Sequence, residues 1–154
     1  MNKGELRALY RQIRLRMSKS EVSTKSRIIC RKLLTEVDWS RNKDISVFEP
    51  IDKLNEVDIR PLLSRLENQA VNFRIVGRNR NSRIPVHKFD LIIVPCLAFD
   101  DDNYRLGWGG GFYDKFLAAQ PQALKIGVCF QNGHTEKLPR EPHDIALDKV
   151  MAEA

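Results

Sequence analysis

The chain has 154 residues, of which 42% are hydrophobic and 30% are charged, and its formal net charge is +6. No stretch approaches the roughly 18 unbroken apolar residues that a membrane span requires, so a transmembrane segment is excluded at this level. We expect one soluble domain over residues 1–154, and the positive charge favours an anionic partner such as nucleic acid, a membrane surface or a polyanionic small molecule.

Cysteine usage and the first residues indicate the compartment. Cys30, Cys96 and Cys129 lie far apart and form no Cys-x-x-Cys pair, so neither a disulfide framework nor a zinc site is predicted. The opening residues keep a charge every few positions and never form the apolar block of a secretory signal. We therefore expect a cytoplasmic protein without a membrane partner.

Two helices are predicted at the start of the chain. The apolar residues of the first recur at the spacing of one helical stripe. They are Leu6, Leu9, Tyr10, Ile13 and Met17. Ser18 and Glu21 then form a capping-box pattern, which predicts a second helix through about residue 34.

Strands and helices are predicted to alternate along the rest of the chain. Short apolar or β-branched runs indicate strands, and apolar residues at helical spacing indicate helices. The strands are expected at 44–48, 71–76, 90–95 and 124–130, and the helices at 57–66, beginning near Pro61, and at 112–119. This alternation predicts a layered α/β fold with a mostly parallel central sheet.

The segment 105–116, RLGWGGGFYDKF, is predicted to bind phosphate. It has four glycines in five residues and lies between the strand that ends at Pro95 and the helix that begins near Phe112. Glycine-rich turns after the strands of an α/β sheet let backbone N–H groups approach phosphate oxygens. The pattern matches neither a Walker A loop nor a dinucleotide fingerprint, and a flexible surface turn is the alternative.

Charged residues on both sides of the glycines favour the phosphate interpretation. The guanidinium of Arg105 carries a fork of donors suited to phosphate, and Asp114 supplies a carboxylate of the kind that holds Mg²⁺ beside a phosphate. On the first helix, Lys3, Arg7 and Arg14 fall within about 40° of one another, which predicts a basic row facing a cleft. Solvated basic side chains are the alternative for that row.

Residues 90–117, DLIIVPCLAFDDDNYRLGWGGGFYDKFL, resemble the signature of the 5-formyltetrahydrofolate cyclo-ligase family. The resemblance extends to the opening Lys3-x-x-x-Arg7, to the acidic turn NEVDI and to the tail LPREPHDIALDKVMAE. It implies a three-layer α/β/α fold of the NagB/RpiA/CoA-transferase-like type. It also implies an enzyme that uses ATP and Mg²⁺ to convert 5-formyltetrahydrofolate into 5,10-methenyltetrahydrofolate, with release of ADP and phosphate.

The same resemblance implies a set of site residues. Those for ATP are Lys3, Arg7, Arg105, Leu106, Gly107, Trp108, Gly109, Gly110, Gly111, Phe112 and Tyr113. Those for the reduced folate are Ile51, Glu56, Trp108 and Tyr113, those for catalysis are Arg105 and Tyr113, and those for the metal are Asp114 and Asp144. From the residues alone, Trp108 either stacks on a ligand or covers the turn. Tyr113 either contacts the substrate or anchors the loop.

One segment departs from the family pattern. Residues 68–89 are shorter than the usual middle section and carry the basic run FRIVGRNRNSRIPVHK, so the wall around the pterin is expected to be open or absent. Three hypotheses follow: an active cyclo-ligase, monomeric or homodimeric; a nucleotide-binding relative without folate activity; and a nucleic-acid-binding module that uses GRNRNSR. The run lacks interleaved aromatic residues, so we do not expect a nucleic-acid partner and prefer an exposed basic hairpin.

Two further groups of residues are expected to lie outside the site. Asp100, Asp101 and Asp102 are interpreted as a solvated acidic loop. His87, His134 and His143 have no partner at ligand or triad spacing and are assigned surface or structural roles.

Overall fold

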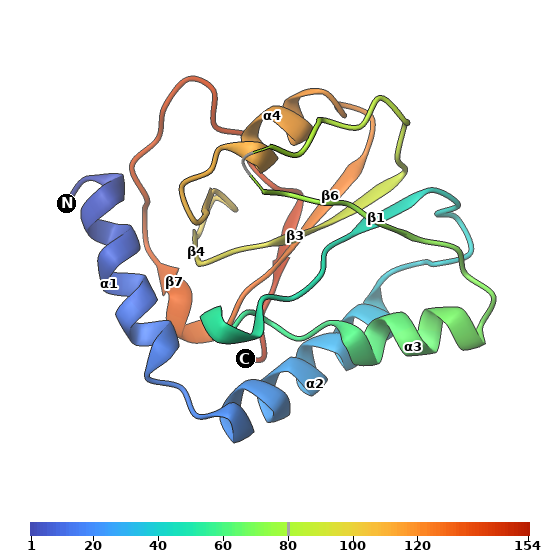
Figure 1. Cartoon of the computed structure of the whole chain (residues 1–154), viewed down its shortest axis with the longest axis horizontal. Coiled ribbons are helices and arrows are strands. Elements are labelled where there is room, and N and C mark those ends of the chain that lie inside the picture. Colours follow the sequence, from blue (N-terminus) through green and yellow to red (C-terminus); the bar gives the residue numbers. More distant parts are fainter. Residues whose placement is uncertain (80) are drawn as a thin grey trace.

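A parallel five-stranded sheet forms the centre of the computed structural model, which describes residues 1–79 and 81–154 (Figure 1). Its strand order is β2-β1-β3-β6-β8, and every neighbouring pair is parallel. The strands are β1 (Ile45–Val47), β2 (Arg74–Ile75), β3 (Leu91–Pro95), β6 (Leu124–Val128) and β8 (Lys149–Met151). The predicted α/β fold with a mostly parallel sheet is confirmed, although β8 was not predicted.

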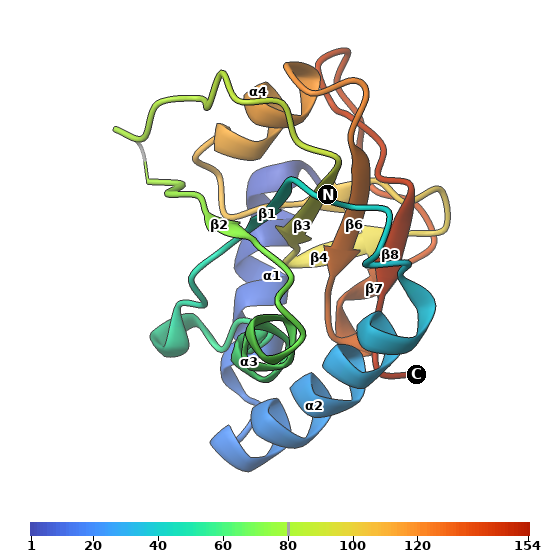
Figure 2. The same cartoon turned by 90° about the vertical axis from the view of Figure 1, so that its right-hand side faces the viewer.

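Helices cover both faces of this sheet and give the three layers (Figure 2). They are α1 (Lys3–Leu15), α2 (Lys19–Glu36), α3 (Arg60–Asn68) and α4 (Phe112–Ala118), with short 3₁₀ turns η1 (Asp52–Leu54) and η2 (Gln131–Gly133). Successive residues of β3 point to opposite faces. Leu91 and Ile93 therefore pack with α2 and α3, whereas Ile92 and Val94 pack with α4. All of β3 is buried, which explains its uninterrupted apolar sequence.

The two predicted helix-start signals, at Ser18 and at Pro61, are confirmed. Ser18 and Glu21 form the capping box of α2, and a capping box that was not predicted, formed by Asn2 and Glu5, begins α1. Pro61 lies in the first turn of α3, where its missing N–H costs no helical hydrogen bond. The helix α2 ends two residues later than expected, at Glu36. None of the helices in the described parts of the chain is long and apolar enough to cross a membrane.

A second, small sheet that was not predicted supports the first helix. It has the order β5-β4-β7, formed by β4 (Ala98–Asp100), β5 (Arg105–Leu106) and β7 (His134–Thr135). Tyr10 of α1 packs against Leu97, Ala98 and Leu106 at this sheet. Leu9 is the exception in the predicted apolar stripe, since 38% of it is exposed.

The expected solvated acidic loop is wrong for its first residue. Asp100 is 1% exposed. Its carboxylate accepts hydrogen bonds from the backbone N–H groups of Asp102 and Tyr104, both at 3.0 Å, and from that of Leu138 at 2.9 Å. Arg140 lies 3.3 Å from the same carboxylate. Asp100 therefore braces the turn that leads to the glycine segment.

A buried arginine joins α1 to the end of the central sheet. Arg14 is 1% exposed and donates hydrogen bonds to the backbone carbonyls of Cys96 at 2.9 Å, Leu97 at 3.1 Å and Asn55 at 3.3 Å. The amide of Asn55 donates in return to the carbonyls of Arg14 and Met17, both at 3.0 Å. The sequence interpretation of Arg14 as part of a row facing a cleft is therefore wrong, because its guanidinium is an internal connector.

We predict that Arg14→Ala lowers the free energy of unfolding by about 3 kcal/mol or more, because several buried carbonyls lose their donor at once. Urea denaturation followed by circular dichroism measures this change. Arg16→Ala is the matched control, since Arg16 is exposed at the end of the same helix, and we expect a change within about 0.5 kcal/mol. Equal unfolding midpoints for the two variants would contradict the connecting role of Arg14.

Candidate functional site

A pocket of about 570 Å³ lies beyond the carboxyl ends of the strands. It is bounded by α1, by the segments that follow β1 and β2, by the glycine loop before α4, and by the tail near residues 141–144. A volume of this size is typical of a small-molecule site, and its position is the one where α/β folds bind ligands. All of the site residues predicted from the sequence line this pocket except Glu56.

The glycines of the loop serve different local requirements. Gly109 and Gly111 have φ angles of 105° and 72°, which residues other than glycine rarely adopt. A Cβ atom on Gly107 would collide with the guanidinium of Arg105. At Gly110 an added Cβ would meet no atom within 4 Å, because this residue borders open space in the pocket. The main chain is therefore bare on the side that a ligand would approach.

Basic side chains of α1 hold this loop in place. The Nε of Arg7 donates to the carbonyl of Gly107 at 3.2 Å, and Arg11 donates to the carbonyl of Trp108 at 2.9 Å. Arg7 also lines the pocket, as Lys3 does one helical turn earlier. The basic row is thus confirmed for these two predicted residues, which lie at the wall of the cleft.

Arg105 lies close to the glycine loop, and its guanidinium has hydrogen-bond donors that are not all used. Its Nη2 donates to the carbonyl of Pro95 at 3.2 Å, and its Nη1 lies 4.0 Å from a carboxylate oxygen of Asp114. Its buried Nε has no hydrogen-bond partner among the described residues. The side chain is 8% exposed, so the surrounding protein holds this guanidinium at the floor of the pocket.

Two predicted metal ligands come together with a histidine. One potential ligand atom each from Asp114, His143 and Asp144 lies within 4.8 Å of the others. The ammonium of Lys3 donates to both carboxylate oxygens of Asp144, at 2.7 and 2.9 Å. Burial by itself would raise the pKa of Asp144, but the hydrogen bonds from Lys3 and from the backbone of Glu141 hold that pKa below its ordinary value. His143 is exposed, in line with the surface role predicted for it, and it lies beside both acids.

The aromatic residues of the loop differ in their surroundings. Trp108 packs partly against the cluster around Tyr10, with the guanidinium of Arg11 5.7 Å from its ring centre, and it also lines the pocket. This position is compatible with both predicted alternatives, covering the turn and stacking on a ligand. The hydroxyl of Tyr113 is buried and has no partner in the described parts of the chain, so it does not anchor the loop by a hydrogen bond there. Burial raises the pKa of Tyr113 well above its ordinary value, which keeps the phenol protonated.

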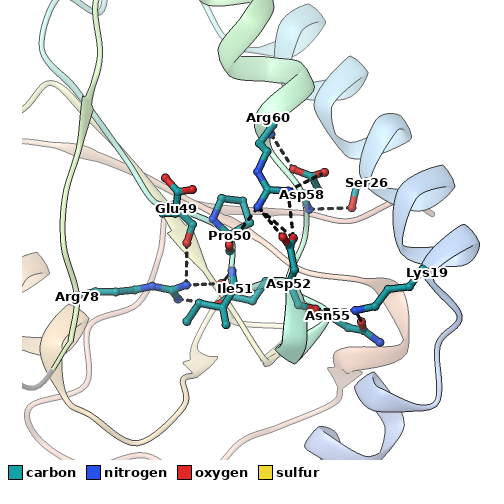
Figure 3. Close-up of polar contacts among 11 residues, drawn as sticks. Lys19, Ser26, Glu49, Pro50, Ile51, Asp52, Asn55, Asp58, Arg60 and Arg78 are labelled. Atoms are coloured by element: carbon teal, nitrogen blue, oxygen red, sulfur yellow. Dashed lines mark hydrogen bonds and ion pairs between the residues drawn. The ribbon is translucent and has the colours of Figure 1, made fainter.

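The far wall of the pocket is apolar with a charged group at its end. Ile51 and Leu54 come from the segment around η1, and Ile75 and Val76 come from β2 and the residue after it. Arg78 follows on the same segment and points toward Glu49 and Ile51 (Figure 3). The short middle section therefore does provide a wall, contrary to the expectation of an open or absent one.

Glu56 is the predicted site residue that the structure places elsewhere. It is 3% exposed and does not line the pocket. Its carboxylate accepts a hydrogen bond from the backbone N–H of Ile51 at 2.8 Å and one from Nη1 of Arg78 at 2.6 Å. Sequence reasoning missed Arg78, because the basic run around it was interpreted as an exposed hairpin. No pattern in the sequence linked one of those arginines to Glu56, because the two residues lie 22 positions apart.

Comparison with known proteins agrees with the family resemblance found in the sequence. The sequence profile of the 5-formyltetrahydrofolate cyclo-ligase family matches residues 53–153. A 5-formyltetrahydrofolate cyclo-ligase from Haemophilus influenzae is 30% identical over 128 residues, which cover 80% of this chain and 68% of that protein.

Two solved structures are similar over nearly the whole chain. A 5,10-methenyltetrahydrofolate synthetase from Mycoplasma pneumoniae has a TM-score of 0.82 and 27% identity, covering 98% of both chains. The synthetase of Aquifex aeolicus has a TM-score of 0.79 and 27% identity, covering 99% of this chain and 90% of that one. The Mycoplasma match along both full lengths means that the short middle section also fits a protein with that name.

We predict that Gly110→Ala weakens the binding of Mg-ATP on the order of tenfold, because the added methyl group occupies space that a phosphate would approach. Its unfolding free energy should change by no more than about 0.5 kcal/mol, since the methyl group meets no protein atom. Isothermal titration calorimetry and urea denaturation measure the two effects.

Gly111→Ala provides the contrast within the same loop. Because Gly111 has a φ angle of 72°, alanine there should cost about 1–2 kcal/mol of stability. Unchanged Mg-ATP binding by a stable Gly110→Ala variant would support the flexible-turn alternative instead of the phosphate cradle.

Proposed function

This chain belongs to the 5-formyltetrahydrofolate cyclo-ligase family, a family of ATP-dependent ligases, and we propose that it converts 5-formyltetrahydrofolate and ATP into 5,10-methenyltetrahydrofolate, ADP and phosphate. One observation carries the proposal. The glycine loop, several basic side chains and the carboxylates of Asp114 and Asp144 meet an apolar wall around a single volume of about 570 Å³. A polyphosphate and a flat, partly apolar acceptor require such a combination.

The proposed reaction activates an oxygen that would otherwise leave poorly. The formyl oxygen bonds to the γ-phosphorus of ATP while the bond from that phosphorus to ADP breaks. N10 then bonds to the formyl carbon and loses its proton, and the carbon–oxygen bond breaks as phosphate departs with the former formyl oxygen. The protein mainly has to hold two substrates in line and offset the charge on the transferred group.

The chain has groups that can offset the negative charge of the transferred phosphoryl group. Lys3 and Arg7 at the α1 wall and Arg105 at the floor are assigned to the phosphates, together with the backbone N–H groups of the loop. Tyr113 lines the pocket as a protonated phenol whose hydroxyl lacks a partner among the described residues. We assign it to donate a hydrogen bond to a substrate oxygen. Because its pKa is raised, the phenol stays protonated and can donate such a bond, but it is not available as a general base.

Asp114 and Asp144 fit a magnesium ion shared with substrate phosphates. Mg²⁺ is commonly bound through one or two carboxylates while phosphates and water complete its shell, and these two acids lie close together at the pocket. When bound there, Mg²⁺ supplies additional positive charge for the phosphate oxygens. The ammonium of Lys3 balances the charge of Asp144, and Lys3 lines the same pocket.

The direct test follows product formation. Purified protein, Mg-ATP and 5-formyltetrahydrofolate are mixed, and the ultraviolet absorbance of the methenyl product is recorded. We expect turnover that requires both substrates. Binding of ATP without turnover would reject the proposed activity and support a nucleotide-binding relative without folate chemistry.

We predict that Asp114→Asn and Asp144→Asn each raise the Mg²⁺ concentration needed for half-maximal turnover on the order of tenfold or more, because an amide is a weaker ligand than a carboxylate. Turnover during a magnesium titration at fixed ATP measures this. Asp101→Asn is the control, since Asp101 is an exposed acid that does not line the pocket. An unchanged magnesium requirement in either variant would remove that residue from the metal site.

A further inference from the structure

Glu56 and Arg78 lie in positions opposite to those predicted from the sequence, which placed the acid in the site and the arginine outside it. Glu56 is buried behind the pocket surface, whereas Arg78 lines the pocket. Arg78 reaches this position from the short segment after β2, and Figure 3 shows it directed at Glu49 and Ile51. The group presented to a ligand at this wall is therefore a guanidinium.

Glu56 has little capacity left for a ligand. One carboxylate oxygen accepts from the Ile51 N–H at 2.8 Å and from Nη2 of Arg78, and the other accepts from Nη1 of Arg78 at 2.6 Å. With 2% of its side chain exposed, this carboxylate acts on its surroundings through Arg78. A planar guanidinium held at two points by a carboxylate has a fixed orientation.

Arg78 is held at further points but keeps free donors. Its Nη2 also donates to the carbonyl of Glu49 at 3.2 Å, and its guanidinium carbon lies 5.4 Å from the ring centre of Phe48. These contacts use both Nη2 protons and one Nη1 proton, which leaves the Nε proton and the second Nη1 proton. The side chain is 13% exposed, and Arg78 lines the pocket.

We propose that Arg78 contacts the acceptor substrate, donating a hydrogen bond to a carbonyl or carboxylate oxygen, and that Glu56 is the positioning residue that orients it. This inference rests on the proposed function and deepens it, because it assigns the far wall of the pocket to the acceptor. An arginine so oriented loses little side-chain entropy when it binds a ligand oxygen.

The surroundings of Tyr113 agree with this assignment. Burial raises the pKa of that phenol, while the positive charges of Arg78 and then Arg105 oppose the rise. Tyr113 and both guanidiniums line the same pocket, and the guanidinium carbon of Arg105 lies 5.4 Å from the centre of the tyrosine ring.

A purely structural tie is the competing explanation. The strand β2 has two residues and pairs with β1 alone, and Val76 adds one hydrogen bond to the carbonyl of Val47 at 2.9 Å. Arg78 could therefore serve only to fasten this wall. The two explanations differ in what they predict for ATP, for the acceptor and for a variant that keeps the wall fastened without a charge.

The experiment measures binding and kinetics for Arg78→Ala, Arg78→Lys and the double variant Glu56→Gln/Arg78→Gln. Calorimetry determines the affinity for 5-formyltetrahydrofolate and, separately, for Mg-ATP. Steady-state kinetics then gives KM for each substrate. The double variant leaves no unpaired buried charge, and thermal unfolding identifies any variant that fails to fold. Arg83→Ala is the matched control, an exposed arginine of the same basic run that does not line the pocket.

We expect Arg78→Ala to weaken acceptor binding and raise its KM by roughly 10- to 100-fold, the loss of a hydrogen bond from a charged donor. The affinity for Mg-ATP should change less than about twofold, and Arg78→Lys should restore part of the acceptor affinity. The folded double variant should lose acceptor affinity as Arg78→Ala does, and Arg83→Ala should behave as the wild type.

Normal acceptor affinity in folded Arg78→Ala, or equal losses for acceptor and ATP, would overturn the assignment of Arg78 while leaving the proposed activity standing. Full acceptor affinity in the double variant would also overturn it, because only the structural tie would then matter. A wild-type protein that neither binds nor converts 5-formyltetrahydrofolate would reject the proposed function, and with it this inference.

Discussion

The architecture depends on a buried positive charge held by neutral acceptors. No carboxylate of the described residues pairs with Arg14, whose guanidinium instead donates to carbonyls at the end of β3 and at the η1 turn. An arginine cannot give up its proton to escape burial, so these carbonyl contacts are obligatory. They fix α1 relative to the sheet, and α1 in turn positions Arg7 and Arg11 against the glycine loop and Lys3 against Asp144.

The pocket consequently has two walls of different construction. The side that we assign to the phosphates is assembled from α1, the loop and the small sheet, with side chains from α1 donating to two loop carbonyls. The side that we assign to the acceptor relies on the short strand β2 and on Arg78, whose partners are Glu56 and the backbone of Glu49. Loops supported by few hydrogen bonds open more readily than packed elements. The two substrates would therefore meet at the boundary between a well-supported surface and a lightly supported one.

Sequence reasoning succeeded where the signal was local. The capping box at Ser18, the uninterrupted apolar strand at 91–95 and the clustered glycines each act within a few residues, so their spacing was sufficient to predict the sheet and the loop. It failed where a partner lies far along the chain. The burial of Arg14 depends on carbonyls 41 to 83 positions away, and the pairing of Arg78 with Glu56 spans 22 positions. Charged residues have no period that identifies such a partner, so Arg14 was predicted to face a cleft and Arg78 to lie in an exposed hairpin.

The outermost place of β2 in the sheet bears on how this fold tolerates changes of length. Because β2 contacts only β1, residues inserted or deleted between β2 and β3 need not alter the register of β1, β3, β6 and β8. The connection instead packs through Phe89 against Phe116 of α4, with ring centres 5.7 Å apart. Evolution can therefore lengthen or trim this rim of the pocket as a separate module, while the other strands of the central sheet keep their alignment.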